Sequence, residues 1–202
     1  MTTEFKSHSQ AGQDIFVKRM LIDTGICPIG FYLDIGCNHP FDLSNTYALE
    51  QQGWTGLLMD NDAVAVEMCR KERSAKNFIA QADATKYKFE GWIGNLKPGG
   101  IDYLSLDVDF CTSDTLTNML ANTDLVFRVA TIEHDSYRFG PGPRDYMRGL
   151  MREAGYELIC QDVSHGGHPY EDWWATPSLV DMKVADKFRS IGQEGIEIVA
   201  RP

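Results

Sequence analysis

The sequence predicts a single α/β domain built on a doubly wound, mostly parallel, Rossmann-like sheet. Short apolar segments alternate with helix-length segments along the chain, and this order favours parallel strands joined by right-handed crossovers. Segments 31–35 and 126–132 are apolar on both faces, as expected for a sheet covered on both sides. At 202 residues the chain has the size of one domain, so we expect one domain over 1–202, with 1–9 as a flexible N-terminus.

Seven segments have the length and composition of strands. They are 31–35, 55–59, 77–80, 101–106, 126–132, 156–160 and 172–175. Four helices are expected between them. Ser44 would cap a helix over 47–52 that stops at Gly53, Asp62 would cap 63–73, Thr112 or Ser113 would open a helix to 121, and Pro143 would begin one that Gly155 ends.

The amino-acid composition limits the kinds of molecule that the protein is expected to bind. The formal net charge is −10 and the densest basic stretch, 70–73, is interrupted by an acid, which disfavours nucleic acid and anionic membranes. No apolar run reaches the roughly 18 residues that span a bilayer, and the first ten residues lack signal-peptide order. Five cysteines, an odd number without a CxxC pair, suit reduced thiols. We therefore expect a cytoplasmic protein.

Acidic residues follow most of the predicted strands, at the edge where doubly wound sheets bind ligands. The first turn, Asp34-Ile35-Gly36, has one glycine, too few to cradle a pyrophosphate but sufficient for S-adenosylmethionine. Asp60, beside Asn61, is placed to accept hydrogen bonds from ribose hydroxyls, and Asp83 to bind an adenine amino group. Alternatively, Asp60 caps a helix and Asp83 is a loop carboxylate.

Segments 9–14, 30–36, 43–46, 53–56, 101–109 and 171–174 resemble, in order and spacing, the FkbM-type methyltransferases. The resemblance implies a class I methyltransferase fold with seven strands, one of them antiparallel near the edge, and O-methylation, often of sugars or polyketide hydroxyls. It implies cofactor-site roles for Gln13, Asp34, Gly36, Asn38, Ser44, Asn45, Asp60, Asp83 and Asp107. The chain departs from the family at Asp109-Phe110, where Glu-Gly is usual, and at His39-Pro40.

The transfer of a methyl group to an alcohol needs a base or a metal. His134 is the candidate base, with Glu133 and Asp109 as further catalytic candidates after the predicted strands. The alternative is a divalent cation, Mg²⁺ above all, held by Asp107, Asp109, Glu133 and His134. His134 could equally bond a neighbouring carboxylate for structure.

These observations predict an S-adenosylmethionine-dependent O-methyltransferase acting on a hydroxyl of a small molecule such as a sugar. Two alternatives remain at this point: a non-catalytic metal- or ligand-binding Rossmann-like protein, and a nicotinamide-dependent oxidoreductase. The first would bind metal without the adenosyl ligand, and the second would bind NAD. The sequence indicates no oligomeric state.

Overall fold

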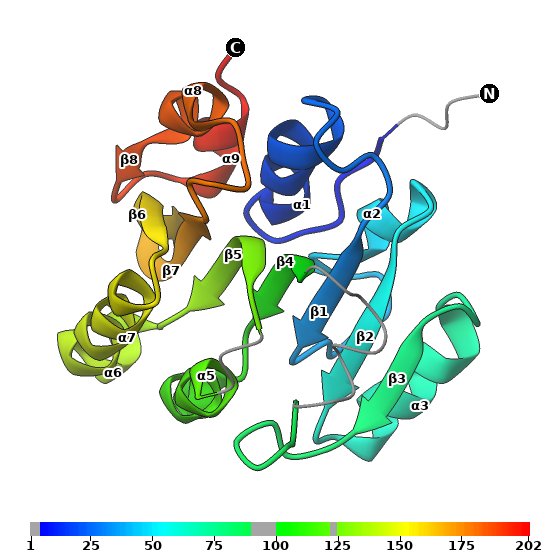
Figure 1. Cartoon of the computed structure of the whole chain (residues 1–202). Helices are drawn as coiled ribbons and strands as arrows, with labels where there is room; N and C mark the ends of the chain where they lie inside the picture. Colours follow the sequence, from blue (N-terminus) through cyan, green and yellow to red (C-terminus); the bar gives the residue numbers. More distant parts are fainter. Residues whose placement is uncertain (1–4, 90–99, 122–124) are drawn as a thin grey trace.

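The computed structural model describes residues 5–89, 100–121 and 125–202, and in it a sheet lies between two layers of helices (Figure 1). The sheet has eight strands in the order β3-β2-β1-β4-β5-β7-β6-β8. Their bounds are β1 Phe31–Ile35, β2 Thr55–Asp60, β3 Phe78–Gln81, β4 Ile101–Leu106, β5 Phe127–Glu133, β6 Glu157–His165, β7 His168–Ala175 and β8 Ser190–Ile191. Only β7 runs antiparallel to its neighbours. The strand order reverses between β1 and β4.

The predicted mostly parallel α/β sheet, with an antiparallel strand near one edge, is confirmed. The predicted number of seven strands is wrong, because the two-residue β8 pairs with β6 beyond it. Two residues are too few to show the alternation of apolar and polar side chains that predicts a strand. Residues 164–170, which are rich in glycine, form the tight turn of the β6–β7 hairpin, with His165 paired to His168 across Gly166 and Gly167.

Eight helices occur in the described part of the chain. They are α1 Gln13–Val17, α2 Tyr47–Gln51, α3 Ala63–Glu72, α5 Thr112–Leu120, α6 Ser136–Phe139, α7 Pro141–Glu153, α8 Met182–Ala185 and α9 Gly195–Val199. A π-helical turn, Lys18–Ile22, continues α1, and 3₁₀ turns cover Asp109–Cys111 and Asp186–Phe188.

Two hydrophobic cores lie on opposite faces of the sheet. One contains Phe16 of α1 and Trp173 of β7, whose rings stack at 4.9 Å. The other contains Leu116 of α5, Met147 of α7 and Trp174 of β7. Adjacent residues of a strand point to opposite faces, so the two tryptophans divide between the cores. Both are fully buried, which assigns them to packing.

The helix ends follow the predictions in part. Asp62 caps α3 by accepting from the N–H groups of Val64 and Ala65, as predicted. Gly155, with φ of 87°, follows the end of α7, also as predicted. The cap of α2 was predicted wrongly, because α2 begins after Thr46 rather than Ser44. The helix predicted to open at Thr112 or Ser113 does begin at Thr112, without a side-chain cap.

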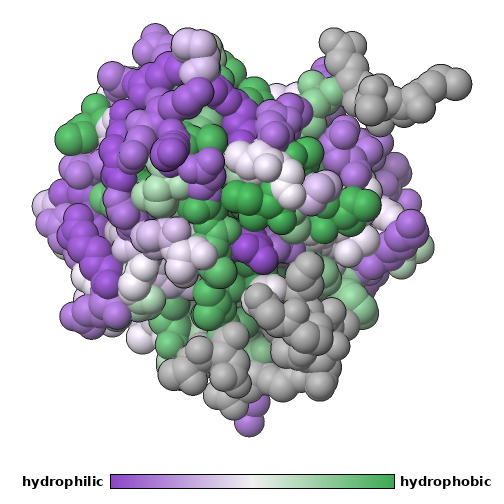
Figure 2. Space-filling model, turned by 45° about the horizontal axis from the view of Figure 1, so that its top comes forward, coloured by the Kyte–Doolittle hydropathy of each residue, from purple (hydrophilic) through white to green (hydrophobic). Residues whose placement is uncertain are grey.

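The surface is mixed, and Figure 2 shows hydrophilic residues surrounding a band of hydrophobic ones on one face. Within the described ranges, no helix is both long and apolar enough to cross a bilayer. The structure describes all five cysteines, and none of them forms a disulfide. Of the predicted flexible N-terminus, residues 1–4 lie outside the described residues. Ser7 and Ser9 donate hydrogen bonds to the carboxylate of Asp14, which joins residues 5–9 to α1.

Candidate cofactor and active site

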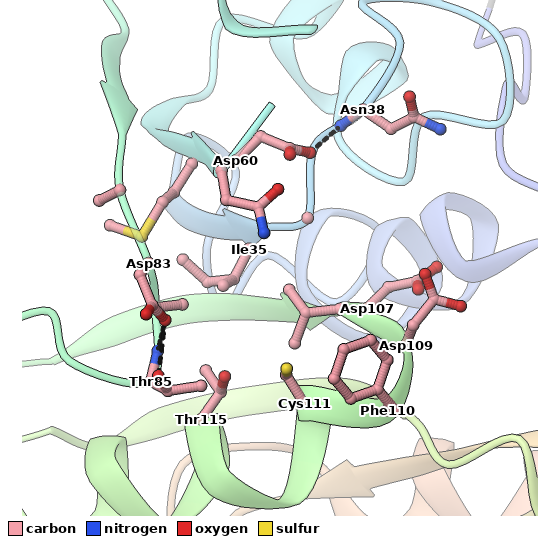
Figure 3. A pocket seen from close by; sticks show the side chains of 16 residues that line it. Ile35, Asn38, Asp60, Asp83, Thr85, Asp107, Asp109, Phe110, Cys111 and Thr115 are labelled. Atoms are coloured by element: carbon pink, nitrogen blue, oxygen red, sulfur yellow. Dashed lines mark hydrogen bonds between the residues drawn. The ribbon is translucent and has the colours of Figure 1, made fainter. Parts of the chain in front are cut away.

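A cavity of about 380 Å³ opens at the carboxyl ends of β1, β2, β3 and β4, where the strand order reverses (Figure 3). This volume is within the range of small-molecule and cofactor sites. The cavity lies where doubly wound sheets bind their ligands. Seven of the predicted site residues line it: Gly36, Asn38, Asp60, Asn61, Asp83, Asp107 and Asp109.

Gly36 is required by packing between two strands. Its φ is 90°, and a Cβ atom at this position would lie 1.6 Å from the carbonyl oxygen of Asp107. The amide of Asp107 in turn donates to the carbonyl of Ile35 at 2.9 Å. The glycine therefore lets the β1 turn lie directly against the end of β4, which places Asp107 at the cavity.

The backbone N–H groups of the turn after β1 already donate hydrogen bonds to other protein groups. The N–H groups of Gly36 and Cys37 both donate to the carbonyl of Met59, at 2.8 and 3.1 Å. The N–H of Asn38 donates to Oδ2 of Asp60 at 2.9 Å (Figure 3). Dinucleotide folds offer such amides to a pyrophosphate. Here three successive amides have protein partners, and carboxylates line the cavity, so this turn would offer a pyrophosphate repulsion in place of its usual backbone donors.

Asp60 and Asp83 lie on opposite sides of the cavity mouth (Figure 3). Asp60 accepts from the amides of Asn38 and Asp62, which fixes its carboxylate at the end of β2. Asp83 accepts from Thr85 and from the ammonium of Lys86 at 2.7 Å, and these bonds lower its pKa to about 2. Asp83 is therefore an ionised acceptor at neutral pH.

The half-buried Asp107 lines the cavity, and the buried Glu133 lies beside it, joined to it by a side-chain hydrogen bond. Burial raises the pKa of Asp107. Burial and the neighbouring charge of Asp107 raise the pKa of Glu133 further, so the pair holds a proton at neutral pH. Glu133 is nine-tenths buried, and its Oε2 has no hydrogen-bond partner. No ion pair joins either carboxyl to a basic side chain of the described residues.

Next to this pair, ligand atoms of Asp109, Glu133 and Asp135 lie within 4.8 Å of one another. The predicted metal set is corrected here, because Asp135 takes the place assigned to His134. Arg138 of α6 already bridges two of these acids, with Nη1 at 3.0 Å from Asp109 and 2.7 Å from Asp135. The guanidinium supplies the positive charge that a cation would bring, so this donor set does not fit a resident metal.

His134 faces away from these acids. Its side chain is 1% exposed, its Nδ1 accepts from the amide of Ser136, and its Nε2 lies 3.5 Å from Asp172 and 3.6 Å from Asp162. With Nδ1 occupied by a donor, the ring carries its proton on Nε2. That geometry leaves His134 no open basic nitrogen, and it favours the structural alternative for this residue over the role of base.

Four residues predicted for the cofactor site do not line the cavity. Gln13 is buried and donates to Tyr170 and Glu171. Asp34 accepts from Thr46, and burial raises the pKa of Asp34 to about 6. The other two, Ser44 and Asn45, bond Arg73 and Ser105 respectively; the Oδ1 of Asn45 is buried without a partner. These residues hold the segment between β1 and α2 against the sheet.

Three turn residues at this edge share a rare conformation. Asn38, Asp109 and Asp135 have φ of 41°, 49° and 43°, in the left-handed region that few side chains adopt. Asn and Asp tolerate it best, because their short side chains bond locally. Asp135 was not predicted as a site residue, although an acid within two residues of a strand end was the available signal.

The sequence matches no known family profile and no curated protein sequence. The fold, in contrast, matches solved structures. A TehB-like S-adenosylmethionine-dependent methyltransferase from Corynebacterium glutamicum is 13% identical, over 81% of this chain and 87% of that one, with a TM-score of 0.52. Magnesium protoporphyrin IX methyltransferase from Synechocystis, solved with bound S-adenosylmethionine, is 14% identical, over 82% and 77%, with a TM-score of 0.55. An N-methyltransferase from Bradyrhizobium japonicum is 13% identical, over 83% and 94%, with a TM-score of 0.51.

The chain thus has the fold of the class I S-adenosylmethionine-dependent methyltransferases. At these identities the likeness shows the fold and not the substrate. The neighbours do not establish the FkbM subtype.

Proposed function

We propose that the protein is an S-adenosylmethionine-dependent O-methyltransferase that acts on a hydroxyl group of a small molecule. The observation that carries the proposal is the cavity at the β1/β4 switch point, where acids follow β2, β3 and β4 and the three amides of the β1 turn already have protein partners. The same cavity in a nicotinamide-dependent enzyme would need donors for a pyrophosphate.

The residues of the cavity match the parts of an adenosyl ligand. Asp60, fixed by two backbone amides, is the acceptor for the two ribose hydroxyls. Asp83 and the neighbouring Thr85 line the outer part, where the adenine amino group would be bound. Asp107, beside the buried Glu133, is the counter-charge for the cationic end of the ligand. The four predicted residues outside the cavity lining are not needed for this assignment.

S-adenosylmethionine supplies a methyl group on a positively charged sulfonium, and that charge is lost when the carbon–sulfur bond breaks. The protein has to align the acceptor oxygen and to receive its proton. Glu133 is the candidate group for the proton, because its Oε2 is buried without a partner and its side chain bonds Asp107, which lines the cavity. A cation bound nearby lowers the pKa of a carboxyl group, which would free Glu133 to act as base. No step requires a metal at Asp109, Glu133 and Asp135, where Arg138 is already bound.

The test is calorimetric titration with S-adenosylmethionine, S-adenosylhomocysteine and NAD. We expect micromolar binding of the two adenosyl ligands and no binding of NAD. Asp60→Asn should weaken both adenosyl ligands by about tenfold or more, the scale of a lost hydrogen bond to a charged group. Glu67→Gln, an exposed carboxylate on the following helix, is the matched control. Binding of NAD, or unchanged affinity in Asp60→Asn, would contradict the assignment.

A further inference from the structure

A second, smaller cavity of about 170 Å³ adjoins the cofactor cavity, and the two share Asp109 and Phe110. Its walls come from segments that are distant in the chain: the turn after β4, the end of α6 and the first turns of α7. Phe110, Phe139, Pro143 and Met147 form the apolar part of the lining. A cavity of about 150 Å³ with such a lining accommodates one benzene ring. Its volume and chemistry therefore suit a single aromatic ring.

The two phenylalanines are unusually exposed for their type. Phe110 is 77% exposed and Phe139 is 40% exposed, although both sit beside buried residues of α7 and β5. Exposed large apolar side chains that converge on one cavity indicate a binding surface rather than a scattered surface residue. The sequence supports this at Phe110, which stands where the family resemblance has glycine.

Arg138 connects the two walls. Its guanidinium bonds Asp109, the neighbour of Phe110, and lies 4.9 Å from the ring centroid of Phe139. The ion pair links α6 to the turn after β4, and the cation–π contact orders Arg138 and Phe139 within α6. Arg138 thus lies between the two phenylalanines and beside the acidic cluster.

We propose that this cavity binds the aromatic ring of the methyl acceptor, so that the substrate is a phenol rather than a sugar. The inference rests on the proposed methyltransferase function and specifies its substrate class. The ring lies between Phe110 and Phe139, and its hydroxyl points past Asp109 toward Glu133. The oxygen gains the methyl group, its proton passes to the carboxylate, and the sulfonium becomes a neutral thioether.

The acidity of a phenol suits the carboxylates that lie near the proposed substrate position. A phenol has a pKa of about 10, as in tyrosine, whereas an alkyl hydroxyl is about as weak an acid as water, near 15.7. Asp109 lines the cavity and lies in one cluster with Glu133 and Asp135, whereas His134, which also lines the cavity, has its Nδ1 occupied. Carboxylates in a buried, acid-rich site can take a proton from a phenol far more readily than from a sugar hydroxyl.

The experiment measures binding of catechol, cyclohexane-1,2-diol and methyl glucoside by NMR of the protein labelled at the methionine methyl groups. It is run with and without saturating S-adenosylhomocysteine, and Met147→Leu identifies the Met147 signal. We expect catechol alone to shift that signal, by the ring current of an aromatic ring in contact. Phe139→Ala should weaken catechol about tenfold, the scale of a lost aromatic pair. The control is Tyr146→Ala, an exposed aromatic of α7 that does not line the cavity.

The outcomes separate the two proposals. Equal binding of the cyclic diol or the glucoside, or no shift at Met147 while S-adenosylhomocysteine binds, would overturn the phenol inference alone. Catechol binding with no binding of either adenosyl ligand would keep the ring site and remove the methyltransferase function. Unchanged affinity for catechol in Phe139→Ala would show that the ring binds elsewhere.

Discussion

Two groups of buried acids lie near the same edge of the sheet, and they are balanced in opposite ways. Asp172 receives two hydrogen bonds of 2.7 Å from Arg148, which also bonds Asp162 at 2.8 Å. Burial alone would raise the pKa of Asp172, but these hydrogen bonds and the nearby His134 lower it. Asp107 and Glu133 have no basic partner among the described residues, and burial raises the pKa of both. We call the first group the paired cluster and the second the unpaired cluster.

Neighbouring residues of one strand can have different roles, because their side chains point to opposite faces of the sheet. Glu171 and Asp172 are adjacent in β7, yet they point to opposite faces of the sheet. Asp172 belongs to the paired cluster, while burial raises the pKa of Glu171 to about 8. The paired cluster holds α7 to the hairpin of β6 and β7. The unpaired cluster carries excess negative charge at the cavity, which is the property expected of a site for a cationic ligand.

The largest effect should come from breaking the paired cluster. Arg148→Met leaves Asp172 buried without its counter-charge, and we expect the free energy of unfolding to fall by about 3–5 kcal/mol. Urea denaturation measures it. Adding Asp172→Asn to this variant should restore part of the loss, because the uncompensated charge is removed. A loss below about 1 kcal/mol in the single variant would show that the cluster contributes little to stability.

A substitution that removes a charge from the unpaired cluster should affect activity rather than stability. Glu133→Gln removes the proton acceptor, so we expect methyl transfer to slow by about 10²-fold, with the free energy of unfolding unchanged or raised. Single-turnover rates and urea denaturation measure the two quantities on the same preparation. His134→Asn tests the alternative base. If that variant slows transfer as much while retaining full stability, the proton passes to His134 and the assignment to Glu133 is wrong.

The third prediction concerns the pH dependence of stability. Asp34 and Glu171 have raised pKa values, about 6 and about 8, so the folded state holds protons that the unfolded state has released. The free energy of unfolding should therefore fall as pH rises from about 4.5 through 8, by at most about 1.4 kcal/mol per pH unit for each group. Urea denaturation at several pH values measures the slope. Glu171→Gln should flatten it between pH 6 and 8, and an unchanged slope there would contradict the assignment.

Most of the fold was predictable because strand alternation and strand-end acids are local properties of the sequence. Asp60 ends β2, and Asp83 and Asp107 lie within two residues of the ends of β3 and β4, so the topology alone brings them to one edge. The strand β8 was not predictable, since two residues carry no period and its pairing depends on the helices around it.

The residues of the site were predictable from the sequence only where no side chain distant in the sequence forms a hydrogen bond that determines their role. Ser44 has the residue type of a ligand contact, but the buried Arg73 occupies its hydroxyl from a helix end 29 positions away. His134 and Asp135 differ by one position, and the left-handed turn at Asp135 decides which of them joins Glu133. Such choices depend on backbone dihedral angles and on side chains far away in the sequence, which a motif does not encode.

The smallest effect is expected beside the unpaired cluster, where Arg138 joins Asp109 to Asp135. Both Arg138 and Asp109 are about half exposed or more, so Arg138→Ala should change the free energy of unfolding by less than about 1 kcal/mol. The same change removes the only basic side chain that the described residues place on Asp109, Glu133 and Asp135. We therefore expect calorimetry to detect Mg²⁺ binding in Arg138→Ala and none in the unmodified protein, whose activity should be unaffected by EDTA. Loss of activity on chelation, with recovery on adding Mg²⁺, would show that a cation and not Arg138 balances these acids.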